Sequence, residues 1–165
     1  MKFSATQAFT SLSALQVTEA YADARLYPTF RSAHFGDTPE VLDLSYGADG
    51  IDLAVRYKLK VDLPAAAEAF VQADKLTFVE YTTLRHDGSG TFDVAPDHYG
   101  HILEAGGEIV TRGQPATRTY NGTITVDLGW AGMMFQDRVE RGIADALEEA
   151  LKLQVPFVEK FVSGS

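Results

Sequence analysis

The chain has 165 residues, of which 45% are hydrophobic and 22% are charged, and its formal net charge at pH 7 is −9. This composition is typical of one globular domain over residues 1–165 and excludes the charge-rich, apolar-poor composition of disordered chains. The negative charge disfavours nucleic acid and anionic membrane surfaces as partners. Because the chain has no cysteine, disulfides and cysteine-ligated metal sites are excluded.

The N-terminal segment does not have the pattern of a signal peptide, because polar residues between Ser4 and Gln16 repeatedly interrupt any apolar run. No stretch elsewhere approaches the ~20 consecutive apolar residues that span a bilayer. We therefore expect a cytoplasmic protein without integral membrane association.

The first predicted element is a half-buried strand, Lys2–Phe9, in which apolar and polar residues alternate. Thr10 or Ser11 can then cap one or two short helices, whose apolar residues recur at near-helical spacing until Pro28. We expect these helices to end near Ser32.

The middle of the chain alternates with a period of two, which predicts six further strands separated by turns. Asp49-Gly50 is typical of a hairpin turn, and Pro64 can begin a short helix that reaches Phe70. Gly106-Gly107 indicates a bulge or bend that curls the sheet. The six alternating segments are Leu42–Tyr46, Ile51–Val61, Lys75–His86, Phe92–Val94, His101–Arg112 and Ala116–Leu128.

The last predicted element is a long amphipathic helix from Trp130 to about Val162. Pro156 should kink or break this helix, because its ring clashes with the carbonyl group one turn earlier and removes one hydrogen bond.

This order of elements predicts an α+β fold in which a curved antiparallel sheet of seven strands wraps around the C-terminal helix. With the first strand, the stretch Ala22–Pro28 and the helix after Trp130, the chain resembles the helix-grip fold of the START-like (SRPBCC) superfamily. Within that superfamily it is similar to an actinobacterial family of unknown function. The resemblance implies a cavity between sheet and helix that holds a lipid, sterol, polyketide or similar hydrophobic ligand, and it implies no catalytic residue.

Two sets of residues are candidates for lining such a cavity. On the long helix, small side chains recur every four residues beside larger apolar ones, which leaves either a pocket or room for close packing against the sheet. The helix candidates are Val139, Gly142, Ile143, Ala146, Leu147 and Ala150. The strand candidates occupy the alternate positions whose side chains are predicted to face the helix. They are Leu53, Val55, Tyr57, Leu59, Phe78, Glu80, Thr82, Arg118, Tyr120 and Ile124.

Glu80 differs from the other residues of this face, because a buried carboxylate needs a partner or a proton. Arg118 is one possible partner. Together with Tyr57 and Tyr120, these residues would give a mainly apolar ligand site a few polar anchors. The alternative is a bulge that slips the register by one residue and turns Glu80 to the surface.

These features favour a protein that binds or carries a hydrophobic small molecule without catalysis. Two other interpretations stay open: an enzyme of the cyclase or lyase type that uses the same polar anchors, and a protein-interaction module with a filled core. The module would use the outer sheet face or the aromatic region from Tyr21 to Phe35. No common catalytic or nucleotide-binding motif occurs, and His98 and His101 in a predicted turn are too few to indicate zinc. We therefore expect no metal and no cofactor.

Overall fold

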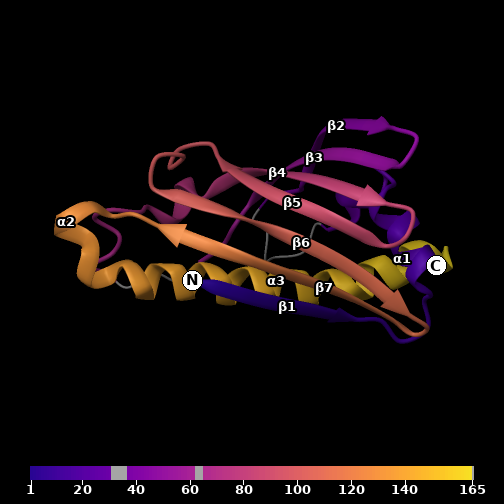
Figure 1. Ribbon diagram of the computed structural model, residues 1–165. Coiled ribbons are helices and arrows are strands. Elements are labelled where there is room, and N and C mark those ends of the chain that lie inside the picture. The colour runs from indigo at the N-terminus through magenta and orange to yellow at the C-terminus, as the bar shows by residue number, and fades with distance from the viewer. Residues whose placement is uncertain (31–36, 62–64, 165) are drawn as a thin grey trace.

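The computed structural model describes residues 1–30, 37–61 and 65–164. Their strands form one antiparallel sheet in the order β1-β7-β6-β5-β4-β3-β2 (Figure 1). Strands β2 to β7 form a meander, because each pairs with the next strand in the chain, and β1 is added beside β7. The predicted helix-grip fold is confirmed. The strands are β1 (Lys2–Ala8), β2 (Glu40–Tyr46), β3 (Gly50–Lys58), β4 (Thr77–Arg85), β5 (Ser89–Pro96), β6 (Leu103–Gly113) and β7 (Ala116–Val126).

The long helix α3 (Gln136–Ser163) runs lengthwise along the inner side of the sheet. In Figure 1, α1 (Ala14–Tyr21) lies near the C-terminal end of α3, and α2 (Gly129–Gly132) lies at the opposite end of the molecule. Three short 3₁₀ turns complete the described elements: η1 (Tyr27–Thr29), η2 (Ala73–Lys75) and η3 (Met133–Phe135). The core therefore forms between one face of the sheet and one side of α3.

The helix that follows β1 begins later than predicted. Its cap is Ser13 rather than Thr10 or Ser11, because the Ser13 hydroxyl accepts a hydrogen bond from the backbone N–H of Gln16 at 3.2 Å. The Gln16 side chain accepts the Ser13 N–H in return, at 2.9 Å. Thr10 instead donates its hydroxyl to Glu159 on α3 at 2.7 Å. Ser32, the predicted end of these helices, lies outside the described residues.

The predicted helix from Pro64 to Phe70 is wrong in its described part. Residues 65–70 form a turn, in which the N–H groups of Phe70 and Val71 both donate to the carbonyl of Ala67 at 2.9 Å. Pro64 itself lies outside the described residues. A few good helix formers are too few to nucleate a helix, because nucleation fixes several residues before the first hydrogen bond forms.

Helix α3 continues through Pro156 to Ser163, so the predicted break is wrong. The Pro156 side chain is exposed, whereas Gln154 and Val158 on either side of it are buried. Packing of this buried side holds the helix together, because proline removes only one backbone hydrogen bond.

The predicted bulge at Gly106-Gly107 is absent, since the register of β6 with both neighbours is continuous there. Instead, Phe3, Gly122, Gly107 and Phe92 pair in one row across four strands. A Cβ atom on Gly122 would lie only 3.0 Å from both the Phe3 and Phe92 rings. Gly122 thus makes room for these rings, which meet edge to face with centroids 6.1 Å apart.

Candidate functional site

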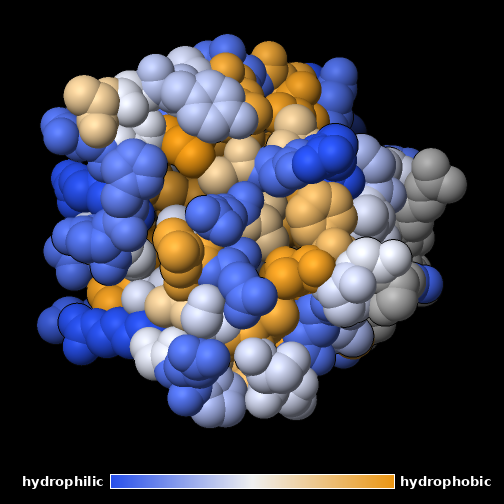
Figure 2. Space-filling model, turned by 90° about the vertical axis from the view of Figure 1, so that its right-hand side faces the viewer, coloured by the Kyte–Doolittle hydropathy of each residue, from blue (hydrophilic) through white to orange (hydrophobic). Residues whose placement is uncertain are grey.

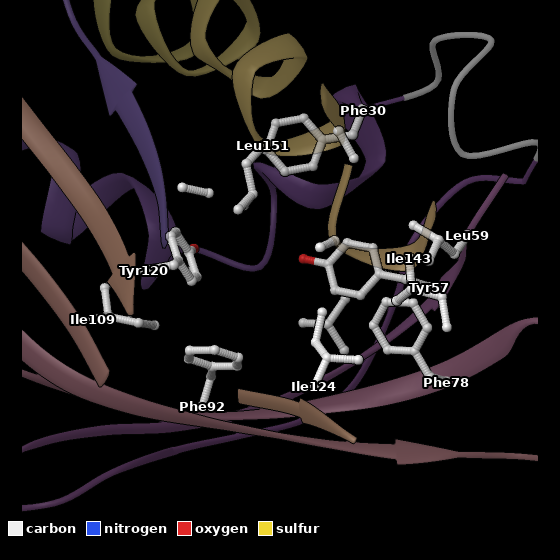
Figure 3. Close-up of a cluster of buried hydrophobic side chains, with 14 of the residues drawn as sticks. Phe30, Tyr57, Leu59, Phe78, Phe92, Ile109, Tyr120, Ile124, Ile143 and Leu151 are labelled. Atoms are coloured by element: carbon white, nitrogen blue, oxygen red, sulfur yellow. The ribbon is translucent and has the colours of Figure 1, made fainter. Parts of the chain in front are cut away.

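The strand candidates lie on the face of the sheet that faces α3. Glu80 is half-buried and the others are buried. The pairing of β4 with β3 and with β5 runs without a shift past Glu80, so the alternative with a slipped register is wrong. On α3, Val139, Ile143 and Ala150 are buried, and Gly142, Ala146 and Leu147 are half-buried. Figure 3 shows aromatic rings from several strands converging below α3, with the Tyr57 hydroxyl pointing toward the middle of the cluster.

Two small pockets lie between the sheet and α3, with volumes of about 20 and 30 Å³. Each has room for about one or two water molecules. They share Leu59, Phe78 and Leu147, so we treat them as one corridor. The apolar pocket is lined by Leu59, Lys75, Leu76, Thr77, Phe78, Val94, Pro96, Tyr99, Leu103, Ala105, Ile143 and Leu147. The polar-ended pocket is lined by Tyr57, Lys58, Leu59, Phe78, Glu80, Leu147, Ala150, Leu151 and Gln154.

The corridor contains only part of the predicted site. Seven of the residues that line it were predicted from the sequence as cavity candidates: Tyr57, Leu59, Phe78, Glu80, Ile143, Leu147 and Ala150. The other candidates line neither of these two pockets. Six of them belong to the surrounding hydrophobic core, namely Leu53, Val55, Tyr120, Ile124, Val139 and Ala146. Thr82 and Arg118 are buried polar residues, and Gly142 is half-buried. Gln154, which adds an amide to the polar end, was missed.

Glu80 is the acidic group of the corridor. The Thr82 hydroxyl donates to its Oε1 atom at 2.9 Å. Burial raises the pKa of Glu80, while the Thr82 hydrogen bond and the positive charge of Arg118 partly oppose that shift. A carboxyl group with a raised pKa takes up a proton more readily, and in its protonated form it donates a hydrogen bond.

Arg118 does not form the ion pair that was considered for Glu80. Its guanidinium lies 4.1 Å above the ring of Tyr21 and 5.2 Å from the ring centre of Tyr120. Its Nε donates to the Tyr120 hydroxyl at 3.1 Å, and its Nη1 donates to the Thr111 hydroxyl at 3.3 Å. Burial by itself would lower the pKa of Arg118, but the surrounding tyrosines, Tyr120 and Tyr21 first, outweigh this effect and raise the pKa overall, so that the group stays charged.

A hydrogen-bonded group beside this guanidinium joins three elements. Gln7 of β1 donates its amide to the Tyr21 hydroxyl at 2.8 Å and to the carbonyl of Leu151 at 2.7 Å. The Tyr21 hydroxyl donates to Gln154 of α3 at 2.7 Å. Gln7 shares the inward parity of Ala5, and Gln154 lies four residues after Ala150, so periodicity could have found both.

Four buried tyrosines surround these groups: Tyr21, Tyr27, Tyr57 and Tyr120. Burial raises the pKa of each above its ordinary value, so all four hydroxyls stay protonated at neutral pH. Among the described residues, this part of the interior thus combines the positive charge of Arg118, the Glu80 carboxyl group with its raised pKa, and several neutral hydroxyl and amide groups.

The described part of the region from Tyr21 to Phe35, residues 21–30, does not present the exposed aromatic patch that an interaction module would need. Tyr21, Leu26, Tyr27 and Phe30 are buried, and Phe35 lies outside the described residues. His98 and His101 are both exposed. Within residues 1–30, 37–61 and 65–164, no three potential metal ligands lie close enough together to hold an ion.

No helix in the described part of the chain is long and apolar enough to cross a membrane. Figure 2 shows the face that lies at the right of Figure 1, where hydrophobic side chains adjoin one another at the top and in the middle, with hydrophilic side chains around and between them.

Comparison with solved structures identifies the fold. The protein TTHA0849 from Thermus thermophilus aligns with a TM-score of 0.67 at 16% identity, and the alignment covers 100% of both chains. The di-domain ARO/CYC protein BexL from the BE-7585A biosynthetic pathway has a TM-score of 0.58 at 13% identity, over 97% of this chain and 49% of BexL. A START superfamily protein from Mycobacterium smegmatis has a TM-score of 0.53 at 15% identity, over 94% of this chain and 97% of its own. The protein therefore has a START-like fold.

Neither a protein-family model nor a curated protein matches the sequence. Membership of the actinobacterial family of unknown function stays a prediction.

Proposed function

We propose that this protein binds or carries a hydrophobic small molecule, such as a lipid, sterol or polyketide, between the sheet and α3. The observation that supports this proposal best is the corridor, which is apolar along β4 to β6 and ends at the polar side chains of Glu80 and Gln154. Such a site combines burial for affinity with a few polar groups for orientation. Removing apolar ligand surface from water contributes roughly 25 cal/mol per Å².

The polar end favours a particular kind of ligand group. Protonated Glu80 and the Gln154 amide can each donate a hydrogen bond, and the Tyr57 hydroxyl can donate or accept one. A carboxylate on the ligand would disfavour ionisation of Glu80 still further. A neutral oxygen, either a hydroxyl or a carbonyl, therefore suits this end of the corridor best.

The corridor has to widen when the ligand binds. Its two pockets hold about 20 and 30 Å³, whereas sites for drug-sized ligands enclose about 300–1,000 Å³. The shared wall residues Leu59, Phe78 and Leu147 separate the two pockets. Movement of α3 away from β3 and β4 would join them into one larger space.

Filling the polar-ended pocket tests the proposal. Ala150→Phe places a ring in that pocket, and Ala95→Phe adds the same bulk on an exposed position of β5. We expect Ala150→Phe to weaken uptake of the fluorescent probe N-phenyl-1-naphthylamine at least tenfold, because about 60 Å² of lost burial is worth about a factor of ten. The Ala95→Phe control should bind the probe like the parent protein.

Equal uptake by a folded Ala150→Phe variant would contradict a site in this corridor. Native mass spectrometry of protein purified from its own host, followed by denaturing extraction, then identifies any natural ligand. A stoichiometric hydrophobic compound is the expected result.

The second candidate function is acid–base catalysis on a polyketide-like substrate. It is favoured by the placement of Glu80, Arg118 and the four tyrosines in one interior, where they influence one another's pKa values. Mass spectrometry after incubation with a linear poly-β-ketone mimic provides the test. Product that forms with the parent protein and not with Glu80→Gln supports catalysis. Absence of product with both proteins contradicts this second candidate function.

A further inference from the structure

The chain passes from β7 into α3 through eight residues without a polar or charged side chain, residues 128–135, which we call the apolar tip. The tip contains α2 and η3 and lies at one end of the molecule, at the left of Figure 1. Its outer side exposes three large apolar side chains: Trp130, Met133 and Met134 are 91%, 66% and 79% accessible. Large apolar side chains gathered in this way mark an interaction surface.

The inner side of the tip is packed. Leu128 is buried, and a Cβ atom on Gly132 would lie 2.3 Å from the Leu128 Cβ atom. A larger residue at position 132 would therefore clash with Leu128. The Phe135 ring lies 6.4 Å from the ring of Phe70. The tip is therefore a folded turn that is apolar on both sides. A helical segment of this kind is expected to be covered on both sides.

The exposed area is small for a protein partner. A fully buried tryptophan removes about 150–250 Å² from water, and two methionines add less, whereas a stable protein interface takes about 1,200–2,000 Å². A projecting tryptophan between flexible methionines is instead typical of side chains that enter the interfacial layer of a bilayer. The geometry favours shallow insertion over docking on a second protein.

The charges decide which bilayer the tip fits. The protein carries a formal net charge of −9, which anionic lipid repels. The charged residues that flank the tip, Asp127, Asp137 and Arg138, do not form a basic cluster. We propose that the apolar tip inserts Trp130, Met133 and Met134 into the interface of an electrically neutral, zwitterionic bilayer. Binding then depends on apolar burial and not on attraction between charges.

Contacts connect the tip to the corridor. Phe135 packs on Phe70, and two residues later the N–H of Gln72 donates to the Tyr99 hydroxyl at 3.0 Å. Tyr99 lines the apolar pocket. Docking would thus bring this end of the corridor close to the bilayer. The docking proposal does not require the corridor to bind a ligand, so the two proposals can fail separately.

Trp130 is the only tryptophan of the chain and reports on the tip directly. On addition of phosphatidylcholine vesicles to the full chain, we expect its emission to shift to shorter wavelength and to be quenched by brominated phosphatidylcholine. The double variant Met133→Asp/Met134→Asp should bind about a hundredfold more weakly, because each buried methionine contributes a factor of ten or more. The control Tyr81→Asp changes another exposed residue, on β4, and should bind like the parent.

Three results would overturn the proposal. The first is emission that does not change with any vesicle. The second is a shift that appears only with anionic vesicles and disappears with salt, which indicates adsorption through charge. The third is a shift without lipid that accompanies a doubling of the mass in sedimentation equilibrium, which assigns the tip to contact with a second copy.

Discussion

At the scale of single residues, Glu80 has a measurable pH signature. Burial raises its pKa above the ordinary value of 4.5, so the folded protein holds the proton more tightly than the unfolded chain does. A group whose pKa is higher in the folded state stabilises the fold through its bound proton. This contribution to stability is complete below the pKa of the unfolded state and is lost as the pH rises through the pKa of the folded state. The Thr82 hydrogen bond and the charge of Arg118 make the upward pKa shift of Glu80 smaller but do not reverse its direction. They therefore shorten the pH range over which stability falls.

Glu80→Gln removes this titration and keeps a polar group of similar size. We expect the free energy of unfolding of the parent protein to fall relative to that of the variant, beginning near pH 4.5 and levelling off above the raised pKa. Denaturant titrations of both proteins between pH 4 and 8 give the difference directly. A difference that stays constant over this range would show that Glu80 is not perturbed.

The residue scale also shows how far sequence reasoning reaches. Parity along β4 placed Glu80 inside, because the register is continuous and each strand exposes alternate residues to the core. It placed Tyr120 beside Arg118, since both lie on the same face of β7, but it did not find Tyr21, whose ring comes from α1, far away in the sequence. Contacts between side chains of distant elements depend on how those elements pack, which periodicity does not encode.

At the scale of elements, the glycine row across the sheet determines how β5, β6 and β7 lie together. A Cβ atom on Gly122 would lie 2.4 Å from the carbonyl oxygen of Gly106, which is backbone and cannot turn away. We therefore expect Gly122→Ala to lower the free energy of unfolding by about 1–3 kcal/mol, as in other overpacked cores. Urea unfolding followed by circular dichroism provides the measurement.

Gly100→Ala is the matched control for this substitution. The nearest atom to a Cβ atom at Gly100 is 3.7 Å away, which is an ordinary contact. Its expected effect lies within about 0.5 kcal/mol, as for most surface substitutions. If both variants lose the same stability, the close approach of the strands at Gly122 is not the cause.

The errors at this scale have a common physical origin. Pro156 predicts a kink or break in α3 and Gly106-Gly107 predicts a bulge or bend in β6, yet the helix continues through the proline and the register of β6 does not shift. In α3, tertiary packing compensates for one lost hydrogen bond. In β6, Gly107 lets the backbone of β7 come close, since a Cβ atom there would lie 2.5 Å from the Cα atom of Gly122. Local propensity gives correct element types here, whereas the effect of a single residue depends on what packs around it.

At the scale of the whole molecule, α3 is held more firmly on one side than on the other. Its contacts concentrate on β1, β7 and α1, while the corridor separates it from β3 and β4. The sequence predicted the direction in which these side chains point but not the depth of the space between them, because a period of two or 3.6 fixes a face and not a distance. This asymmetry predicts that α3 parts from the sheet on the corridor side when a ligand binds.

Crosslinking tests this motion in a chain that has no cysteine of its own. In the double variant Leu59→Cys/Leu147→Cys, both thiols face the corridor, and a short cleavable bismaleimide would tie α3 to the residue that follows β3. We expect the tie to reduce uptake of N-phenyl-1-naphthylamine at least tenfold relative to the untied variant. Uptake should return when a reductant cleaves the linker, because the tie removes the open state that the probe requires.

The control places the same linker where no motion is expected. The side chains of Ser4 on β1 and Asn121 on β7 are exposed and form a hydrogen bond of 2.8 Å across two paired strands. Tying Ser4→Cys to Asn121→Cys should leave probe uptake unchanged, since these strands move together. Full uptake by the tied Leu59→Cys/Leu147→Cys variant would mean that the probe binds elsewhere, and the function would then have to be sought outside the space between the sheet and α3.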